Sequence, residues 1–170
     1  MLLTHELLPM LQQSRATVVA TASMANLMAR PDLTDLNGLR EFHAFRNYAN
    51  SKLANILFTQ ELFARFPELN PVAFHPGVVH TNFSLDTRSL AKYLYKIPLA
   101  RFYTIDDTEG GKHLTYFITG TPGIMWEPGH YYDGPSRTPG RINKHATAPG
   151  FAARHFDLSS DMLGIDWQKN

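Results

Sequence analysis

Residues 47–63, NYANSKLANILFTQELF, carry the strongest helical pattern in the chain. Within the helix that we predict over 44–66, apolar side chains recur mainly on one side: Leu53, Ile56, Leu57, Phe63 and Phe66. A stripe with this spacing is typical of an amphipathic helix that packs against a core. Pro67 cannot continue the helix and is expected to end it.

The segments around this helix predict strands that alternate with helices. Three short apolar runs are expected to be strands: ATVVAT at 16–21, PVAFHPG at 71–77 and GHYYDG at 129–134. Further helices are expected over 2–13, 107–119 and 149–163, a loop over 23–42, and short helices within 84–103. This alternation favours an α/β fold with a parallel sheet, in one domain spanning 1–170.

The composition is that of an ordinary globular domain and excludes several functions. Hydrophobic residues make up 44% of the 170 positions and charged residues 18%. A formal net charge of +1, with scattered basic residues, does not support nucleic-acid binding. The chain has no cysteine and its eight histidines are dispersed, so no metal site or catalytic thiol is expected. We find neither a transmembrane run nor a signal peptide and expect a cytoplasmic protein.

Tyr48 and Lys52 stand four positions apart, on consecutive turns of the long helix. A phenol can donate a proton to a carbonyl that accepts hydride, and the phenolate can remove one in the reverse direction. An ammonium about 4 Å away stabilises a phenolate by about 4 kcal/mol at an effective dielectric constant near 20. The alternative interpretation is packing, with the lysine extended beside a half-buried tyrosine, since this spacing also arises by chance.

Two other segments are expected at the same place in the fold. Ser23 follows the strand at 16–21, and the turn HPGVVHT at 75–81 closes the strand at 71–77. The carboxyl ends of parallel strands share one edge of the sheet, where α/β proteins place their chemistry. A serine hydroxyl there can donate to a substrate oxygen, or it can simply cap the strand end. We interpret His75 and His80 as packing residues.

These segments together resemble the short-chain dehydrogenase/reductase family. YANSK is similar to its Tyr-x-x-x-Lys signature, TAS with Ser23 to the end of its catalytic-serine strand, and HPGVVHT to its Pro-Gly turn. The stretch NSKLANILFTQEL resembles the retinol-dehydrogenase-like branch. The resemblance covers the whole chain but only the C-terminal half of a family member. It implies a partial Rossmann-like domain, a doubly wound parallel sheet without the N-terminal dinucleotide-binding half.

The resemblance also implies an NAD(P)-dependent oxidoreductase that transfers hydride between nicotinamide and an alcohol or carbonyl. Its catalytic residues would be Ser23, Tyr48 and Lys52. Contacts with NAD or NADP would come from Tyr48, Lys52, Pro76, Gly77, the Val79 amide and the Thr81 hydroxyl. Residues 82–105 correspond to the substrate-covering segment of the family, and their apolar content points to a small lipophilic substrate.

The glycine-rich turn that holds the cofactor pyrophosphate in this family does not occur in the 170 residues. Three or four remaining hydrogen bonds, at about 1 kcal/mol each, predict a dissociation constant near 1 mM or weaker. Two alternatives therefore stay open: a truncated, inactive member of the family, or a non-enzymatic oligomerisation or interaction module. An open edge at strand 16–21 would favour a homo-oligomer or pairing with a related chain.

Overall fold

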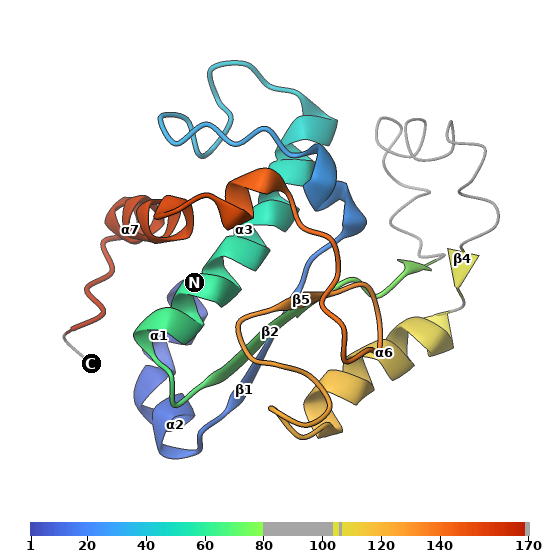
Figure 1. Ribbon diagram of the computed structural model, residues 1–170. Coiled ribbons are helices and arrows are strands. Elements are labelled where there is room, and N and C mark those ends of the chain that lie inside the picture. The colour runs from blue at the N-terminus through green and yellow to red at the C-terminus, as the bar shows by residue number, and fades with distance from the viewer. Residues whose placement is uncertain (80–103, 106, 169–170) are drawn as a thin grey trace.

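The computed structural model describes residues 1–79, 104–105 and 107–168 (Figure 1). Its α-helices are α1 (Leu2–Glu6), α2 (Leu8–Gln13), α3 (Ala44–Arg65), α6 (Asp107–Thr119) and α7 (Phe151–Leu163). The short 3-10 helices are η1 (Met24–Met28) and η3 (Lys144–Thr147). The strands are β1 (Thr17–Thr21), β2 (Asn70–Phe74), β3 (Val78–Val79), β4 (Thr104–Ile105) and β5 (Tyr131–Tyr132). Helices and strands alternate as the sequence predicts.

The main sheet has three parallel strands in the order β1-β2-β5. Thr21 pairs with Phe74, and Phe74 pairs with Tyr132, so the three strands end at the same level. A second, two-stranded parallel sheet joins β3 and β4. The predicted parallel α/β sheet is confirmed, and β1 lies at the edge of its sheet in the described part of the chain. Its outer backbone groups form the open edge expected from the sequence.

Two predicted strands are shorter than expected because proline and glycine interrupt them. The strand predicted over 71–77 ends at Phe74, since Pro76 has no N–H to continue the ladder and Gly77 has φ +97°. The strand predicted over 129–134 contains only Tyr131 and Tyr132. The first strand, β1, is also shorter than predicted, since it begins at Thr17, one residue later than expected.

The helix predicted over 2–13 is wrong as one continuous element. It divides at Leu7 into α1 and α2, because Pro9 has no N–H to donate to the carbonyl of His5. The loop predicted over 23–42 contains the short helix η1, which Ser23 caps. By contrast, the predicted helices over 107–119 and 149–163 are confirmed within two residues, and Gly164 ends the latter.

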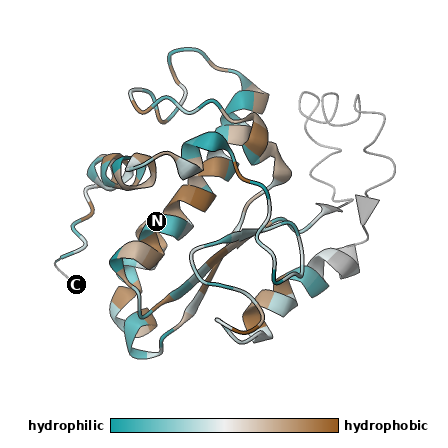
Figure 2. Cartoon of the chain, in the orientation of Figure 1, coloured by the Kyte–Doolittle hydropathy of each residue, from teal (hydrophilic) through white to brown (hydrophobic). Residues whose placement is uncertain are grey.

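Helices pack on both faces of the main sheet (Figure 1). On one face, Phe117 of α6 contacts Val72, Phe74 and Tyr132 of the strands. On the other face, Ile56 of α3 joins Ala73 and Tyr131. Figure 2 shows hydrophobic residues along both helices. In the described ranges, no helix has the length and apolar character needed to cross a bilayer.

The long helix α3 is held from its outer side by α7. Phe58 and Phe156 stack with ring centroids 5.9 Å apart, and the Arg65 guanidinium lies 2.6 Å from the Asp157 carboxylate. The buried side of α3 is formed by Ala49, Leu53, Ile56, Leu57, Thr59 and Leu62. These contacts fix the rotation of α3 about its axis. They therefore also fix which of its residues face the carboxyl edge of the sheet.

Candidate active site

Lys52 connects α3 to the carboxyl end of β1. Its ammonium donates to the Thr21 carbonyl oxygen at 3.2 Å and lies 5.6 Å from the centroid of the Tyr48 ring. The Asn55 amide donates to the same oxygen at 2.9 Å. Burial lowers the pKa of the Lys52 ammonium, because desolvation disfavours its charged form. Tyr48, Lys52 and Asn55 therefore form one polar face of α3 beside the end of β1.

Ser23 stands two residues beyond Thr21 and is half-buried. Its Oγ accepts a hydrogen bond from the Ala25 N–H at 3.2 Å, so the hydroxyl caps η1. A serine hydroxyl that accepts can still donate its own hydrogen. The structure thus makes Ser23 the N-cap of η1, where the sequence left a strand-end cap as the alternative. The hydroxyl can still donate, two residues beyond the Thr21 carbonyl that binds Lys52.

The Pro-Gly turn leaves β2 at the same edge. His75 extends the ladder by one bond, since its N–H donates to the Tyr132 carbonyl at 2.8 Å. Pro76 and Gly77 follow and are half-buried. Val79 belongs to β3, paired with Ile105 of β4. His80, Thr81 and positions 82–103 of the predicted substrate-covering segment lie outside the described residues.

His75 interacts electrostatically with Lys52, a predicted site residue, and with His113 and Asp133, which we did not predict. Its side chain is 8% exposed, and its Nδ1 has no hydrogen-bond partner in the described ranges. Burial lowers the pKa of His75; the Asp133 carboxylate opposes this shift, while His113 and Lys52 add to it. Asp133 accepts a hydrogen bond from the Tyr131 hydroxyl at 2.6 Å. The interpretation of His75 as a packing residue fits its burial but does not account for these charged neighbours.

The stability of the protein is expected to fall as the solution is acidified below about pH 6.5, the usual pKa of histidine. Burial lowers the pKa of His75 and of His155, so the native state binds fewer protons than the unfolded state in this range. The unfolding free energy should therefore fall by up to about 1.4 kcal/mol per pH unit and histidine. Urea unfolding at pH 5, 6, 7 and 8 measures this slope.

His75→Gln should reduce the slope, because it removes one of the two histidines whose pKa is lowered by burial and which take up protons on unfolding. The exposed His130, changed to Gln, is the matched control for the substitution itself. Equal slopes for His75→Gln and the wild type would contradict this account.

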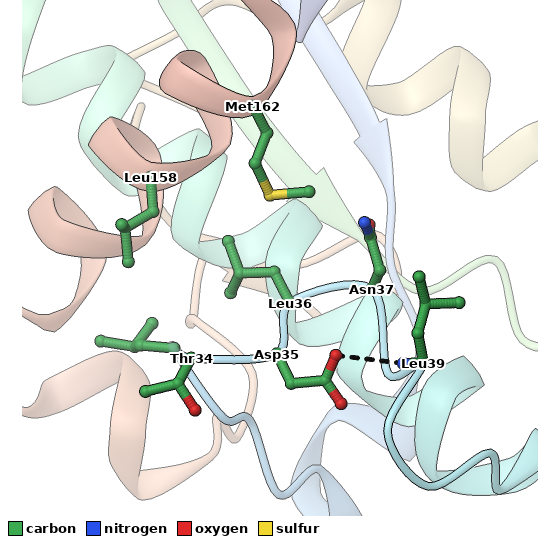
Figure 3. Close-up of a pocket in the computed structure, with 8 residues that line it drawn as sticks. Thr34, Asp35, Leu36, Asn37, Leu39, Leu158 and Met162 are labelled. Carbon is green, nitrogen blue, oxygen red and sulfur yellow. Dashed lines mark hydrogen bonds between the residues drawn. The ribbon is translucent and has the colours of Figure 1, made fainter.

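A shallow pocket of about 280 Å³ lies apart from these residues, between the loop before α3 and helix α7 (Figure 3). It is lined by Leu33, Thr34, Asp35, Leu36, Asn37, Leu39, Leu158 and Met162. The Asp35 carboxylate accepts hydrogen bonds from the backbone N–H groups of Leu39 and Arg40, both at 3.1 Å. Its charge therefore serves to fold the loop. None of the predicted site residues lines this pocket.

The described residues bring Ser23, Tyr48, Lys52, Pro76 and Gly77 to the carboxyl edge of the sheet, as expected from the parallel topology. Their catalytic and cofactor-binding roles stay a prediction. Sequence reasoning missed five polar residues of this region: Asn26, Asn55, His113, Asp133 and Asn143. No local spacing marks Asn26, His113, Asp133 or Asn143, because they come from separate segments. Only Asn55, three residues after Lys52 on the same helix face, carried a signal that could have been used.

Comparison with known proteins gives relatives along almost the whole chain. Retinol dehydrogenase 11 of Mus musculus is 29% identical over 171 residues, which cover 98% of this chain and 52% of that protein. Retinol dehydrogenase 14 of the same species is 30% identical, with 96% of this chain and 49% of that protein covered. The chain therefore spans about half the length of the curated relatives it matches. No family model matches the sequence.

A solved structure supports the fold. The crystal structure of an uncharacterised protein from Mycobacterium paratuberculosis superposes with a TM-score of 0.63 at 27% sequence identity. The match covers 89% of this chain and 52% of that one. The partial Rossmann-like fold predicted from the sequence is thereby confirmed.

Proposed function

Since the chain corresponds to the C-terminal half of a short-chain dehydrogenase/reductase of the retinol-dehydrogenase-like branch, we propose that it carries the proton-transfer residues of an NAD(P)-dependent oxidoreductase. The observation that supports this most directly is the anchoring of Lys52 between Thr21 and the Tyr48 ring. The Lys52 ammonium, the Tyr48 phenol and the turn at Ser23 thus lie at one edge of the sheet. The proposed reaction is hydride transfer between nicotinamide and an alcohol or carbonyl.

In the proposed mechanism, Tyr48 donates a proton to the carbonyl oxygen and removes it in the reverse direction. The Lys52 ammonium lies beside the Tyr48 ring during this transfer, and the Ser23 hydroxyl donates to the substrate oxygen as negative charge develops there. When bound, the nicotinamide supplies or accepts the hydride. The relatives are named for retinol, a lipophilic alcohol, which favours a substrate of that class.

The residues at the carboxyl edge fit the nicotinamide end of the cofactor. An ammonium has three N–H donors, and the hydrogen bond to Thr21 uses one of them. Lys52 can therefore also hold the ribose hydroxyls, while Pro76 and Gly77 would lie against the ring. For the pyrophosphate end, the 170 residues contain no glycine-rich turn. We therefore propose contacts only to the nicotinamide half.

Weak cofactor binding that depends on Lys52 is the expected result. Ligand-observed NMR with NADPH and NADH should give a dissociation constant of about 1 mM, because only three or four hydrogen bonds of about 1 kcal/mol remain. Lys52→Met should weaken binding at least about tenfold, because two such bonds to the ribose are lost. The exposed Lys144, changed to Met, is the matched control. Binding that is absent at 10 mM, or that Lys52→Met leaves unchanged, would refute the proposal.

A second candidate function, pairing with another copy or a related chain, is favoured by the surface beside β1. Leu3 and Met10 of α1 and α2 are 72% and 57% exposed, and β1 lies at the edge of the described sheet. Open strand edges and exposed apolar side chains favour association. Light scattering distinguishes a monomer from an oligomer, and a monomer at high concentration would count against this candidate.

A further inference from the structure

Two buried asparagines connect the turn after Ser23 to the loop before α7. Asn26 is fully buried and Asn143 is 6% exposed, although 116 residues separate them in the sequence. The Asn143 backbone N–H donates to the Asn26 Oδ1 at 3.0 Å. The Asn143 side-chain amide donates to the carbonyl oxygens of Asn26, Leu27 and Ala29, at 3.0, 3.3 and 3.0 Å. The side-chain amide of Asn143 therefore binds three carbonyl oxygens of η1 and of its C-terminal end.

The same hydrogen-bond network reaches Ser23. The side-chain amide of Asn26 donates to the Ser23 carbonyl at 2.9 Å, and its backbone N–H donates to the same oxygen at 3.0 Å. At the other end, the Asn143 Oδ1 accepts from the His145 N–H at 3.0 Å. A continuous chain of hydrogen bonds therefore links Asn143 through Asn26 to Ser23, the residue that we place in the catalytic site.

Helix η1 depends on such outside support. It is a five-residue 3-10 helix, a type with poor hydrogen-bond geometry that rarely persists in longer runs. Ser23 caps it through the hydrogen bond from Ala25, so the direction of the Ser23 hydroxyl follows the geometry of this turn. Buried polar groups that are fully bonded make a turn rigid, whereas a partly bonded network is costly.

From these contacts we propose that Asn143 is a positioning residue for Ser23. Its amide fixes η1 so that the Ser23 hydroxyl stays directed at the substrate oxygen. This inference rests on the proposed function. A displacement of about 1 Å in a reacting geometry costs up to about a hundredfold in rate. We therefore expect Asn143→Asp to lower kcat by about 10- to 100-fold with little change in KM.

Asn143→Asp is the sharpest variant because it keeps the shape and the acceptor for His145. It replaces the N–H donors by an oxygen that faces three carbonyl oxygens. Asn143→Ala removes the donors without adding repulsion, and serves if the aspartate variant does not fold. Asn37→Asp, the same chemical change at an exposed position of the neighbouring loop, is the control and should leave kcat unchanged.

The decisive readout is kcat in the presence and absence of the Ser23 hydroxyl. In the wild-type background Asn143→Asp should lower kcat for reduction of a lipophilic aldehyde by NADPH, whereas in a Ser23→Ala background it should change kcat less than about twofold. An equal loss in both backgrounds would show a purely structural effect and overturn the positioning role.

Amide hydrogen exchange tests the same contact without turnover. The Ala25 N–H should exchange at least about tenfold faster in Asn143→Asp, while Leu53 in α3 keeps its rate. Unchanged exchange at Ala25 would overturn the inference. A wild-type chain without turnover would instead refute the proposed function, and the exchange rates would then decide alone whether Asn143 fixes the Ser23 turn.

Discussion

Replacing Tyr48 by phenylalanine is expected to lower kcat by about 10³-fold, within the range that general acid–base catalysis contributes. The substitution removes only the phenolic oxygen. The ring stays in place, and so does the contact that puts the Lys52 ammonium 5.6 Å from its centroid. No hydrogen bond joins this hydroxyl to another residue among those described, so the fold should lose little stability. The assay measures NADPH consumption with a lipophilic aldehyde at millimolar cofactor.

Tyr116→Phe provides the matched control for this experiment. The Tyr116 hydroxyl donates to the Met125 carbonyl at 2.8 Å, away from the candidate site. Its removal should cost about 1 kcal/mol of stability and leave kcat within twofold of the wild type. If Tyr48→Phe retained more than a third of wild-type kcat, Tyr48 would not be the proton donor, and the packing interpretation of its spacing to Lys52 would be preferred.

The elements that the sequence predicted well are those specified by local patterns. The long helix α3 follows from the apolar spacing of Leu53, Ile56 and Leu57, and its end from Pro67. The shared carboxyl edge of β1 and β2 follows from parallel topology, which brings Ser23 and Pro76 together. Local pattern was misleading at 2–13, where apolar periodicity continued through a proline that the backbone could not accommodate in one helix.

The polar surroundings of the site could not be predicted because they arise only in the tertiary structure. His75, His113 and Asp133 come from the ends of β2 and β5 and from α6, and no spacing relates them. Asn26 and Asn143 are similarly unremarkable in sequence, since each stands in a segment that reads as a polar loop. A hydrogen bond between such distant residues depends on how the carboxyl ends of β1 and β5 are placed by the core.

The largest effect on stability is expected from Phe117→Ala. Phe117 is fully buried on α6, with ring centroids 5.4 Å from Phe74, 5.5 Å from Tyr132 and 6.1 Å from Trp126. Phenylalanine-to-alanine changes in cores cost about 3–5 kcal/mol, because a cavity remains where the ring was. Urea unfolding followed by tryptophan fluorescence measures the change. Ile118→Ala, at the next position but 58% exposed, should cost less than about 1 kcal/mol.

This variant also tests whether the core positions the candidate site. Phe74 and Tyr132, the strand residues that contact Phe117, directly precede His75 and Asp133 at the carboxyl edge. A cavity beneath them should loosen that edge, so the His75 N–H, bonded to the Tyr132 carbonyl, should exchange faster in Phe117→Ala than in Ile118→Ala. A loss of less than about 2 kcal/mol would mean that neighbouring side chains fill the space. In that case the packing of Phe117 against Phe74 and Tyr132 would not be what holds the ends of β2 and β5 in register.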